Sequence, residues 1–297
     1  MQATTLHRTR LAPTPSGYLH LGNALSFALT ATLAQRYGAR TLLRIDDMDR
    51  ERLQPAYVQD IFDTLHFLGI PWNEGPQTIP EYELHFSQMH RLVRYNEALQ
   101  QLVTQDKVYA CTCTRAQVLR ARADGIYPGT CRDKRLTLDT PNAAWRLRTD
   151  ATPLYVKTLE QGTMQASLPA GMQDFVVRKK DGYPAYQLAS LVDYRYFGVD
   201  LIVRGKDLWE ATLAQQYLAL LLNAATFAQA TFYHHPLLLE TDGQKLSKSA
   251  GATSIRYLRN HGYTPGAVYN MIAVALQLKT PANSWATLGM QVLQDIL

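Results

Sequence analysis

Cysteine is scarce in this chain, and long apolar runs are missing. The 297 residues include three cysteines, too few to build a disulfide framework. No uncharged run reaches the length that spans a bilayer, and the N-terminal stretch MQATTLHRTRLAP lacks the apolar core of a signal peptide. These absences exclude a disulfide-stabilised secreted protein and a membrane-spanning one. We expect a cytoplasmic protein with no membrane partner.

Charge is ordinary in amount, with a small positive excess. Hydrophobic residues make up 46% of the chain and charged residues 19%, as in globular proteins, and the net charge is +5. The length suits two domains, or one large domain with an insertion. The basic excess is compatible with a nucleic-acid partner, but it does not identify one, because many other enzymes share it.

The N-terminal region has the pattern of a strand, a helix and a second strand. Residues 6–12 predict a strand that ends at Pro13, and residues 41–45 predict a second buried strand. Between them, apolar residues at helical spacing predict a helix that stops at Gly38. This order indicates a parallel sheet, whose ligands bind at the carboxyl ends of the strands. The loop PTPSGYLH and the acidic cluster DDMD both fall at those ends.

The rest of the chain changes character twice. Residues 55–107 look helical, and residues 108–183 look like an insertion with short β-like runs and a hairpin turn at Asp181-Gly182. The α/β pattern then returns with the strand VDLIVRG, a helix whose capping box pairs Asp207 with Glu210, and a strand HPLLLE. The last 45 or so residues look helical.

Two short stretches combine into a phosphate-binding signature. In KLSKS, Lys245 and Lys248 lie on a loop after a strand, where they can neutralise phosphate charge; alone, the stretch is equally well explained as a solvated lysine loop. In YLHLGN, His20 and Gly22 lie at the start of a helix after the first strand. There the helix N-terminus faces an anion, the imidazole donates to a phosphate oxygen, and the glycine lets a nucleotide approach the backbone.

All three cysteines fall within 21 residues. Cys111 and Cys113 form a Cys-x-Cys pair, and together with Cys131 they can wrap one tetrahedral metal ion. Asp124 or a water molecule is a candidate fourth ligand, and three reduced structural cysteines are the alternative. No nearby His or Glu suggests water activation, so we expect a structural metal rather than a catalytic one.

Five stretches carry a family resemblance. RLAPTPSGYLHLGN, RIDDMD, VVRKKDGYPAYQLASLVD, IVRGKDL and KLSKS resemble, in order, the class I glutamyl-tRNA synthetase catalytic domain, from residue 8 to about residue 250. HLGN and KLSKS correspond to the two class I signatures, written HIGH and KMSKS. Only 49 residues follow Lys248, too few for an anticodon-binding domain. The truncated branch of the family, the glutamyl-queuosine tRNA(Asp) synthetases, therefore fits better.

The resemblance implies both the activity and the architecture. That branch activates glutamate with ATP and attaches it to the queuosine base at the wobble position of tRNA(Asp). The implied fold is an α/β, Rossmann-like catalytic domain, a parallel sheet with helices on both faces, with an inserted zinc-binding α+β subdomain and a short helical C-terminal segment. The expected limits are 1–107 and 184–240 for the two catalytic halves, 108–183 for the insertion, and 241–297 for the KLSKS loop and terminal helices.

The resemblance also assigns roles to single residues, and we expect a monomer. Arginines at strand ends suit the carboxylates of glutamate, and an aspartate suits its ammonium group. The alternative without a binding role is a surface residue at a strand end for Arg204 and a core aromatic residue for Tyr186. The implied glutamate contacts are Arg10, Ala12, Thr14, Asp46, Tyr186 and Arg204. The implied ATP contacts, with Mg²⁺ bound to ATP, are Thr14, His20, Gly22, Asn23 and Lys248, and the implied catalytic residues are His20, Gly22, Lys245 and Lys248. The implied ligands of one structural Zn²⁺ are Cys111, Cys113, Tyr127 and Cys131.

The chain departs from the family pattern at two positions. Asp46 stands where the glutamyl branch usually has glutamate, as in related glutaminyl enzymes, and Tyr194 follows Asp193 where paired aspartates are usual.

Several alternatives stay open. One is a short glutamyl-tRNA synthetase that charges a tRNA 3′ end, and another is an inactive paralogue that only binds RNA or a partner protein. A third is another nucleotidyltransferase that makes a small metabolite. A basic set in the insertion is either a phosphate-contacting surface or a solvated face; its members are Arg115, Arg120, Arg122, Arg132, Lys134 and Arg135.

Overall fold

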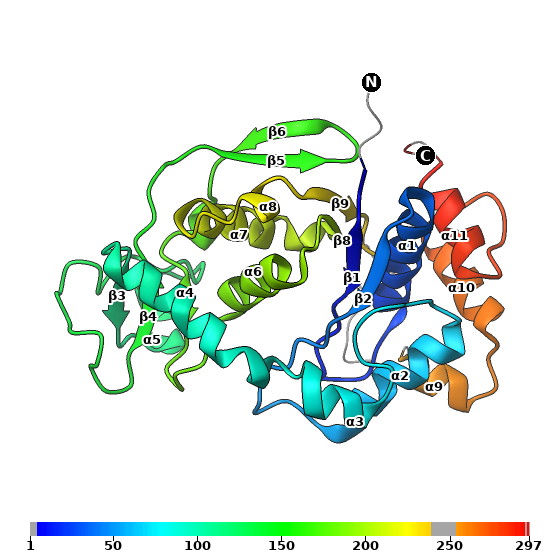
Figure 1. Ribbon diagram of the computed structural model, residues 1–297, viewed down its shortest axis with the longest axis horizontal. Helices are drawn as coiled ribbons and strands as arrows, with labels where there is room; N and C mark the ends of the chain where they lie inside the picture. Colours follow the sequence, from blue (N-terminus) through cyan, green and yellow to red (C-terminus); the bar gives the residue numbers. More distant parts are fainter. Residues whose placement is uncertain (1–4, 239–253, 295, 297) are drawn as a thin grey trace. The chain divides into compact units, whose positions relative to one another are not determined.

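A computed structural model describes residues 5–238, 254–294 and 296. The chain forms two compact units, each assembled from separate segments (Figure 1). The first unit draws on residues 1–90, 199–207 and 231–297, and the second on residues 91–198 and 208–230. Among the described residues, no helix combines the length and the apolar character needed to cross a bilayer. The four domain limits given above remain predictions.

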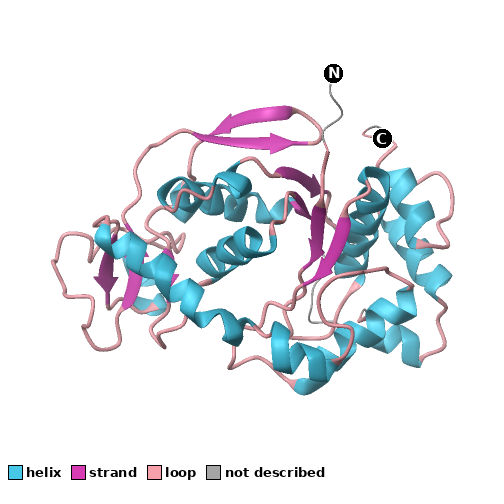
Figure 2. Cartoon of the chain, in the orientation of Figure 1, coloured by secondary structure: helices cyan, strands magenta, loops and turns pink. Residues whose placement is uncertain are grey.

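The first unit contains parallel strands, as predicted. Its strands are β1 (Arg8–Leu11), β2 (Arg40–Leu43), β8 (Leu201–Gly205) and β9 (Thr231–His235). β1 pairs in parallel with β2, and β8 pairs in parallel with β9 (Figure 2). β8 also runs beside β1, because the Asp200 amide donates to the Arg8 carbonyl at 3.0 Å. The strands are mostly buried even though they carry polar side chains, among them Arg10, Arg204 and His234.

Helices cover this parallel arrangement. They are α1 (Leu21–Tyr37), α2 (Pro55–Leu68), α3 (Ile79–Glu81), α9 (Ile255–Asn260), α10 (Pro265–Ala275) and α11 (Trp285–Val292), with the short helical turns η1 (Tyr82–Phe86) and η2 (Gln88–Arg91) after α3. α1 ends at Gly38, whose left-handed φ of 66° lets its N–H bond to carbonyls of the last turn, as predicted. α10 and α11 pack along α1 (Figure 1).

The second unit is mixed α and β, with antiparallel pairing. Its strands are β3 (Val108–Cys111), β4 (Ala144–Leu147), β5 (Leu154–Thr158), β6 (Gly162–Ala166) and β7 (Val176–Arg178). β4 lies between β3 and β7, and β5 forms a hairpin with β6. Its helices are α4 (Leu92–Thr104), α5 (Arg115–Ala121), η3 (Ala170–Met172), α6 (Tyr186–Phe197), α7 (Trp209–Leu221) and α8 (Ala225–Ala228). The predicted turn at Asp181-Gly182 is confirmed, because Gly182 has a φ of 91° and its N–H donates to the Lys179 carbonyl.

Three local expectations are wrong. The strand expected at HPLLLE lies earlier: in the described part of this stretch only His235 belongs to a strand, because β9 uses the β-branched and aromatic residues before Pro236, which has no N–H to donate. The capping box at Asp207 does not form, because α7 begins at Trp209 with Leu208 at its N-cap and no side-chain capping bond; Asp207 lies in the preceding turn η4 (Lys206–Leu208). The helical stretch 55–107 is broken after Leu68, where Gly69 takes a left-handed conformation.

Candidate active site and metal centre

Two buried arginines lie at the carboxyl edge of the parallel strands in the first unit. Arg10 is the third residue of β1, and Arg204 is the fourth of β8; their exposed fractions are 5% and 2%. The Arg10 Nη1 atom donates to the carbonyl oxygen of Val203 at 2.8 Å, so its guanidinium reaches the end of β8 that carries Arg204. The structure therefore brings together the two cations that the sequence analysis proposed for the carboxylates of glutamate.

Asp46 follows β2 at the same edge and is bound to a buried arginine. Arg44 donates to both carboxylate oxygens of Asp46, at 2.7 and 2.9 Å, and both side chains are almost fully buried. The Asp46 amide donates to the Pro13 carbonyl at 2.9 Å, which joins this segment to the loop containing Ala12 and Thr14. The sequence analysis missed Arg44, although its spacing of two residues from Asp46 was a possible signal.

His20 caps the N-terminus of α1. Its Nδ1 atom accepts the N–H of Gly22 at 3.1 Å, and the Asn23 side chain in turn accepts the His20 N–H at 3.1 Å. Because Nδ1 is the acceptor, the neutral ring carries its proton on Nε2, the tautomer that can donate to a phosphate. A Cβ atom at Gly22 would lie 3.0 Å from the His20 ring, so this glycine also leaves room for the capping imidazole.

The turn that carries His20 is held from two sides. The Leu19 N–H donates to the Asp60 carboxylate at 3.0 Å, and the Leu19 carbonyl accepts the N–H of Ile255, the first residue of α9, at 2.7 Å. Arg256 donates to the Tyr18 hydroxyl and lies 4.5 Å from the centre of its ring. Asp60 is 2% exposed, and burial raises its pKa. No local pattern had marked these residues, because their partners are far apart in the sequence.

Three residues predicted for the active site are not found at the carboxyl edge of the first unit as the structure describes it. Lys245 and Lys248 lie outside the described residues. Tyr186 is the first residue of α6 in the second unit, and it is 41% exposed. Their predicted roles remain predictions.

A further histidine occupies the same edge of the first unit. His234 pairs with Arg204 in the β8–β9 register and stacks on Phe232, with ring centres 5.9 Å apart. Burial, together with the charge of Arg204, lowers the pKa of His234 to about 3. The imidazole is therefore neutral at neutral pH. The sequence analysis missed His234 because it placed the strand after this residue.

In the second unit, the cysteines converge as the sequence predicted. The sulfur atoms of Cys111, Cys113 and Cys131 all lie within 4.8 Å of one another, and those of Cys113 and Cys131 are 3.6 Å apart. The Tyr127 hydroxyl lies 3.5 Å from the Cys111 sulfur. Three thiolates and one phenolate oxygen at these separations suit a tetrahedral ion such as Zn²⁺. The residues present therefore fit the implied metal.

The position of the fourth ligand favours tyrosine over aspartate. The Tyr127 hydroxyl accepts the Cys131 N–H at 2.8 Å, and the Arg146 guanidinium lies 3.6 Å from the centre of its ring. Asp124, by contrast, is exposed and bound to Arg122. Of the two candidates, only Tyr127 is held next to the sulfur atoms.

The protonation of the thiols differs within the cluster. Burial raises the pKa of Cys113 to about 11. Burial opposes ionisation of Cys131 as well, but a backbone hydrogen bond with Thr112 and the neighbouring thiol of Cys113 lower its pKa overall. A metal ion held by these sulfur atoms would take the place of the thiol protons.

The basic set of the insertion is not uniform. Arg132 is half-buried and donates to the Asp174 carboxylate and to the Thr149 carbonyl, so it holds the subdomain together. Arg122 pairs with Asp124 in solvent. The remaining exposed members are Arg115, Arg120, Lys134 and Arg135. They stay candidates for phosphate contacts.

The chain is similar to several known proteins. The family described as tRNA synthetases class I (E and Q), catalytic domain, matches residues 7–282. A glutamyl-Q tRNA(Asp) synthetase of Deinococcus radiodurans is 36% identical over 277 residues, which cover 90% of this chain and 88% of that protein. Glutamate–tRNA ligase 2 of Syntrophus aciditrophicus is 33% identical over 91% of this chain and 57% of that ligase. The chain thus spans little more than half the length of this ligase.

A solved structure agrees with the fold. The crystal structure of a glutamate–tRNA synthetase from Elizabethkingia anophelis matches 90% of this chain and 61% of its own chain, with a TM-score of 0.71 and 25% sequence identity.

Proposed function

Because the chain belongs to the family of class I tRNA synthetases for glutamate and glutamine, we propose that it activates L-glutamate with ATP and transfers the glutamyl group to the queuosine base of tRNA(Asp). The observation that carries the activation step is the edge where Arg10, Arg204 and Asp46 gather beside the helix capped by His20. The choice of queuosine as the acceptor is supported by relatives named glutamyl-Q tRNA(Asp) synthetase. The region matched by this chain makes up most of the length of each of them.

Glutamate recognition follows from the charges at this edge. The α-carboxylate must stay available for reaction, so the side-chain carboxylate is the group that a guanidinium grips, and Arg204 is our candidate. Arginine binds a carboxylate through two parallel hydrogen bonds, which lysine cannot do. The substrate ammonium group is assigned to Asp46. Arg44 already partly neutralises Asp46, so the attraction of this carboxylate for a simple cation is reduced.

The first chemical step is an in-line displacement. An oxygen of the α-carboxylate attacks the α-phosphorus of ATP, the bond to the β-phosphate oxygen breaks, and pyrophosphate leaves. The Nε2–H of His20 donates to the phosphate chain, and Lys248 adds positive charge as the leaving group departs. Mg²⁺ bound to ATP supplies further neutralisation of the phosphates. No side-chain nucleophile is required.

The second step transfers the glutamyl group. A hydroxyl of the queuosine ring attacks the carbonyl carbon of the adenylate, AMP leaves, and the hydroxyl proton passes to solvent. We assign one Zn²⁺ to Cys111, Cys113, Tyr127 and Cys131, where it shapes the insertion and takes no part in either step.

ATP–pyrophosphate exchange tests the activation step. We expect exchange that depends on glutamate and needs no tRNA. Aspartate and glutamine serve as matched controls, because each changes one feature of the side-chain carboxylate. Absence of exchange with glutamate would remove the activation step, and the proposal with it.

Parallel transfer assays separate the two acceptors. With radiolabelled glutamate, we expect label on tRNA(Asp) that carries queuosine and none on the same tRNA carrying guanosine at that position. Label on the 3′ end of tRNA(Glu) would instead support the second candidate, a glutamate–tRNA ligase, which the similarity to relatives of that name favours.

A further inference from the structure

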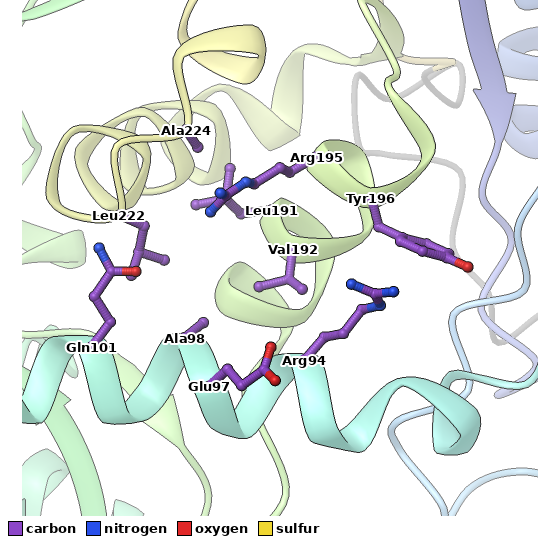
Figure 3. Close-up of a pocket in the computed structure, with 10 residues that line it drawn as sticks. All are labelled: Arg94, Glu97, Ala98, Gln101, Leu191, Val192, Arg195, Tyr196, Leu222 and Ala224. Carbon is purple, nitrogen blue, oxygen red and sulfur yellow. The ribbon is translucent and has the colours of Figure 1, made fainter.

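The second unit contains a pocket that the proposed activity does not use. It has a volume of about 430 Å³ and lies between α4, α6 and the segment that joins α7 to α8 (Figure 3). This size falls in the range of pockets that bind small organic groups. Aliphatic, aromatic, amide, carboxylate and guanidinium side chains line it.

The helices on either side of the pocket are locked together. Arg91, which immediately precedes α4, donates to both carboxylate oxygens of Asp193 on α6, at 2.7 and 3.0 Å. The hydroxyl of Tyr95 on α4 donates to the same carboxylate at 2.7 Å. Asp193 and Tyr95 are fully buried. The walls are therefore fixed in advance, and a ligand need not order them.

The next residue completes the support. Tyr194 is 1% exposed and stacks on Phe227 with ring centres 5.4 Å apart. The tyrosine that replaces the second aspartate of the family pattern is thus a core residue, and Asp193 is a structural anchor of the pocket.

The lining combines three kinds of chemistry. Leu191, Leu222 and Ala224 are almost fully buried and form an apolar floor. Glu97 and Gln101 project from one face of α4 toward the pocket (Figure 3). This places a carboxylate and an amide within a partly apolar site.

An arginine and an aromatic ring stand together at one end of the pocket. The Arg94 guanidinium lies 4.3 Å from the centre of the Tyr196 ring, and Tyr196 is 49% exposed (Figure 3). Tyr196 also contacts Phe197, with ring centres 4.7 Å apart, and the Arg91 guanidinium lies 5.1 Å from the Phe197 ring. The exposed ring is therefore held by the same network that locks the helices, yet it keeps an accessible surface.

We propose that this pocket binds one unpaired nucleotide of an RNA. Aromatic rings and arginine planes are the surfaces on which proteins stack unpaired bases, and Tyr196 with Arg94 offers both. Glu97, on α4 near Arg94, can bond the edge of the base, and Arg195 can bond its phosphate. The two arginines outnumber the single carboxylate, which suits a polyanion. Identifying this RNA with the tRNA substrate rests on the proposed function.

Direct RNA binding tests the pocket. The probe is fluorescein-labelled tRNA(Asp), titrated with the full chain by fluorescence anisotropy at two or more salt concentrations. Tyr196→Ala should weaken binding by about 5- to 100-fold, the usual loss for one stacked base. Tyr196→Phe, which keeps the ring, should restore most of the affinity. Arg195→Ala should lower the slope of log affinity against log salt by about one.

A control variant separates the pocket from general effects on α4. Val93→Ala alters a residue of the same helix that is 69% exposed and does not line the pocket, so its RNA affinity should match that of the wild type. Thermal melting confirms that each variant is folded. Wild-type affinity in Tyr196→Ala, or equal losses in Tyr196→Ala and Val93→Ala, would overturn the proposal.

Two further measurements are needed. One distinguishes a nucleotide within RNA from a free mononucleotide, and the other separates failure of the pocket proposal from failure of the proposed function. Free AMP, GMP, CMP and UMP at millimolar concentration should not displace the RNA. If they displace it from the wild type but not from Tyr196→Ala, the pocket binds mononucleotides, which would contradict the RNA assignment. If the wild type shows no glutamate-dependent ATP–pyrophosphate exchange and still binds RNA in a way that depends on Tyr196, that result would refute the proposed function and would leave the proposal of an RNA-binding pocket standing.

Discussion

The carboxyl edge of the first unit and the cysteine cluster of the second hold their functional groups in different ways. At the edge, regular elements do the positioning: Arg10 and Arg204 lie in strands, and His20 caps a helix. In the cysteine cluster, Cys113 and Cys131 lie outside helices and strands, and Tyr127 lies on the loop between them. The first region is therefore formed whenever its sheet forms, whereas the loops of the second would gain stability from the Zn²⁺ that we propose there.

Hydrogen bonding supports this contrast. Around the cysteines, the Asp174 carboxylate accepts from the Tyr109 hydroxyl at 2.8 Å, from the Thr149 amide at 3.0 Å, and from Arg132. The Asp174 side chain thus joins a strand to two loops. At the carboxyl edge of the first unit, hydrogen bonds between strands hold the segments together. We therefore expect the second region to be the more sensitive of the two to removal of the proposed Zn²⁺.

Replacing Lys248 tests the catalytic half of the comparison with the largest effect. Lys248→Ala removes a cation that stabilises developing phosphate charge, so we expect ATP–pyrophosphate exchange to fall by about 100-fold or more. Zinc content and melting temperature should not change. Lys279→Ala, an exposed lysine of the first unit, is the matched control. Near-normal exchange in Lys248→Ala would remove this lysine from the mechanism.

Replacing Cys113 tests the other half. Cys113→Ser removes one ligand, so bound zinc should fall from one ion per chain to almost none. Structural zinc contributes on the order of 10 kcal/mol of apparent binding free energy in small domains, so hydrogen exchange should become faster around β3 and β4. Thr112→Ala, between the two cysteines, is the control. Elemental analysis that finds no zinc in the wild type would disprove the metal assignment.

Asp60 offers a smaller and more local test of the edge. Asp60→Ala leaves the buried Leu19 amide without its acceptor, which costs about 1–3 kcal/mol in the free energy of unfolding. The shifted His20 turn should raise the KM for ATP more than the KM for glutamate. Asp63→Ala removes the other carboxylate near Arg259 and serves as the control. If the two variants behave alike in urea unfolding and in both KM values, Asp60 does not stabilise the turn that carries His20.

The pH dependence of stability gives a graded effect. The pKa of His234 is about 3 in the folded chain against an ordinary value of 6.5, so between these values the unfolded chain binds a proton that the folded chain does not. Stability should therefore fall as the pH drops below 6.5, by at most about 1.4 kcal/mol per pH unit for this one group.

The matching variant isolates that contribution. His234→Gln cannot take up the proton, so urea unfolding at pH 7, 6 and 5 should show a shallower slope than the wild type. The pKa of the neighbouring His235 is also lowered, mainly by burial, so part of the slope should persist. An unchanged slope would contradict a neutral, buried His234.

Local patterns predicted the elements of the first unit better than the contacts that complete it. Apolar spacing predicted α1 and its end at Gly38, and the order of elements predicted the parallel strands. The hydrogen bond that the Leu19 N–H donates to Asp60 joins residues 41 positions apart, and in the second unit the bond that Arg91 donates to Asp193 joins residues 102 positions apart; no periodicity encodes such pairs. These contacts arise from packing.

The metal centre shows another limit of sequence reasoning. Spacing alone identified the three cysteines but left Asp124 and water as candidate fourth ligands. Tyr127 came from the family resemblance, and the geometry around its hydroxyl now supports it. A loop ligand cannot be chosen from spacing, because the chain between Cys113 and Cys131 can fold so that several polar residues face the sulfur atoms.

The most direct test of the central proposal is mass spectrometry of nucleosides from queuosine-containing tRNA(Asp) after incubation with the protein, glutamate and ATP. Digestion to nucleosides separates the wobble base from the 3′ adenosine, so the product itself reports the acceptor. The proposal predicts that queuosine is converted to its glutamyl derivative, and that omission of ATP prevents this. Unchanged queuosine, or glutamate found on the 3′ adenosine, would contradict it.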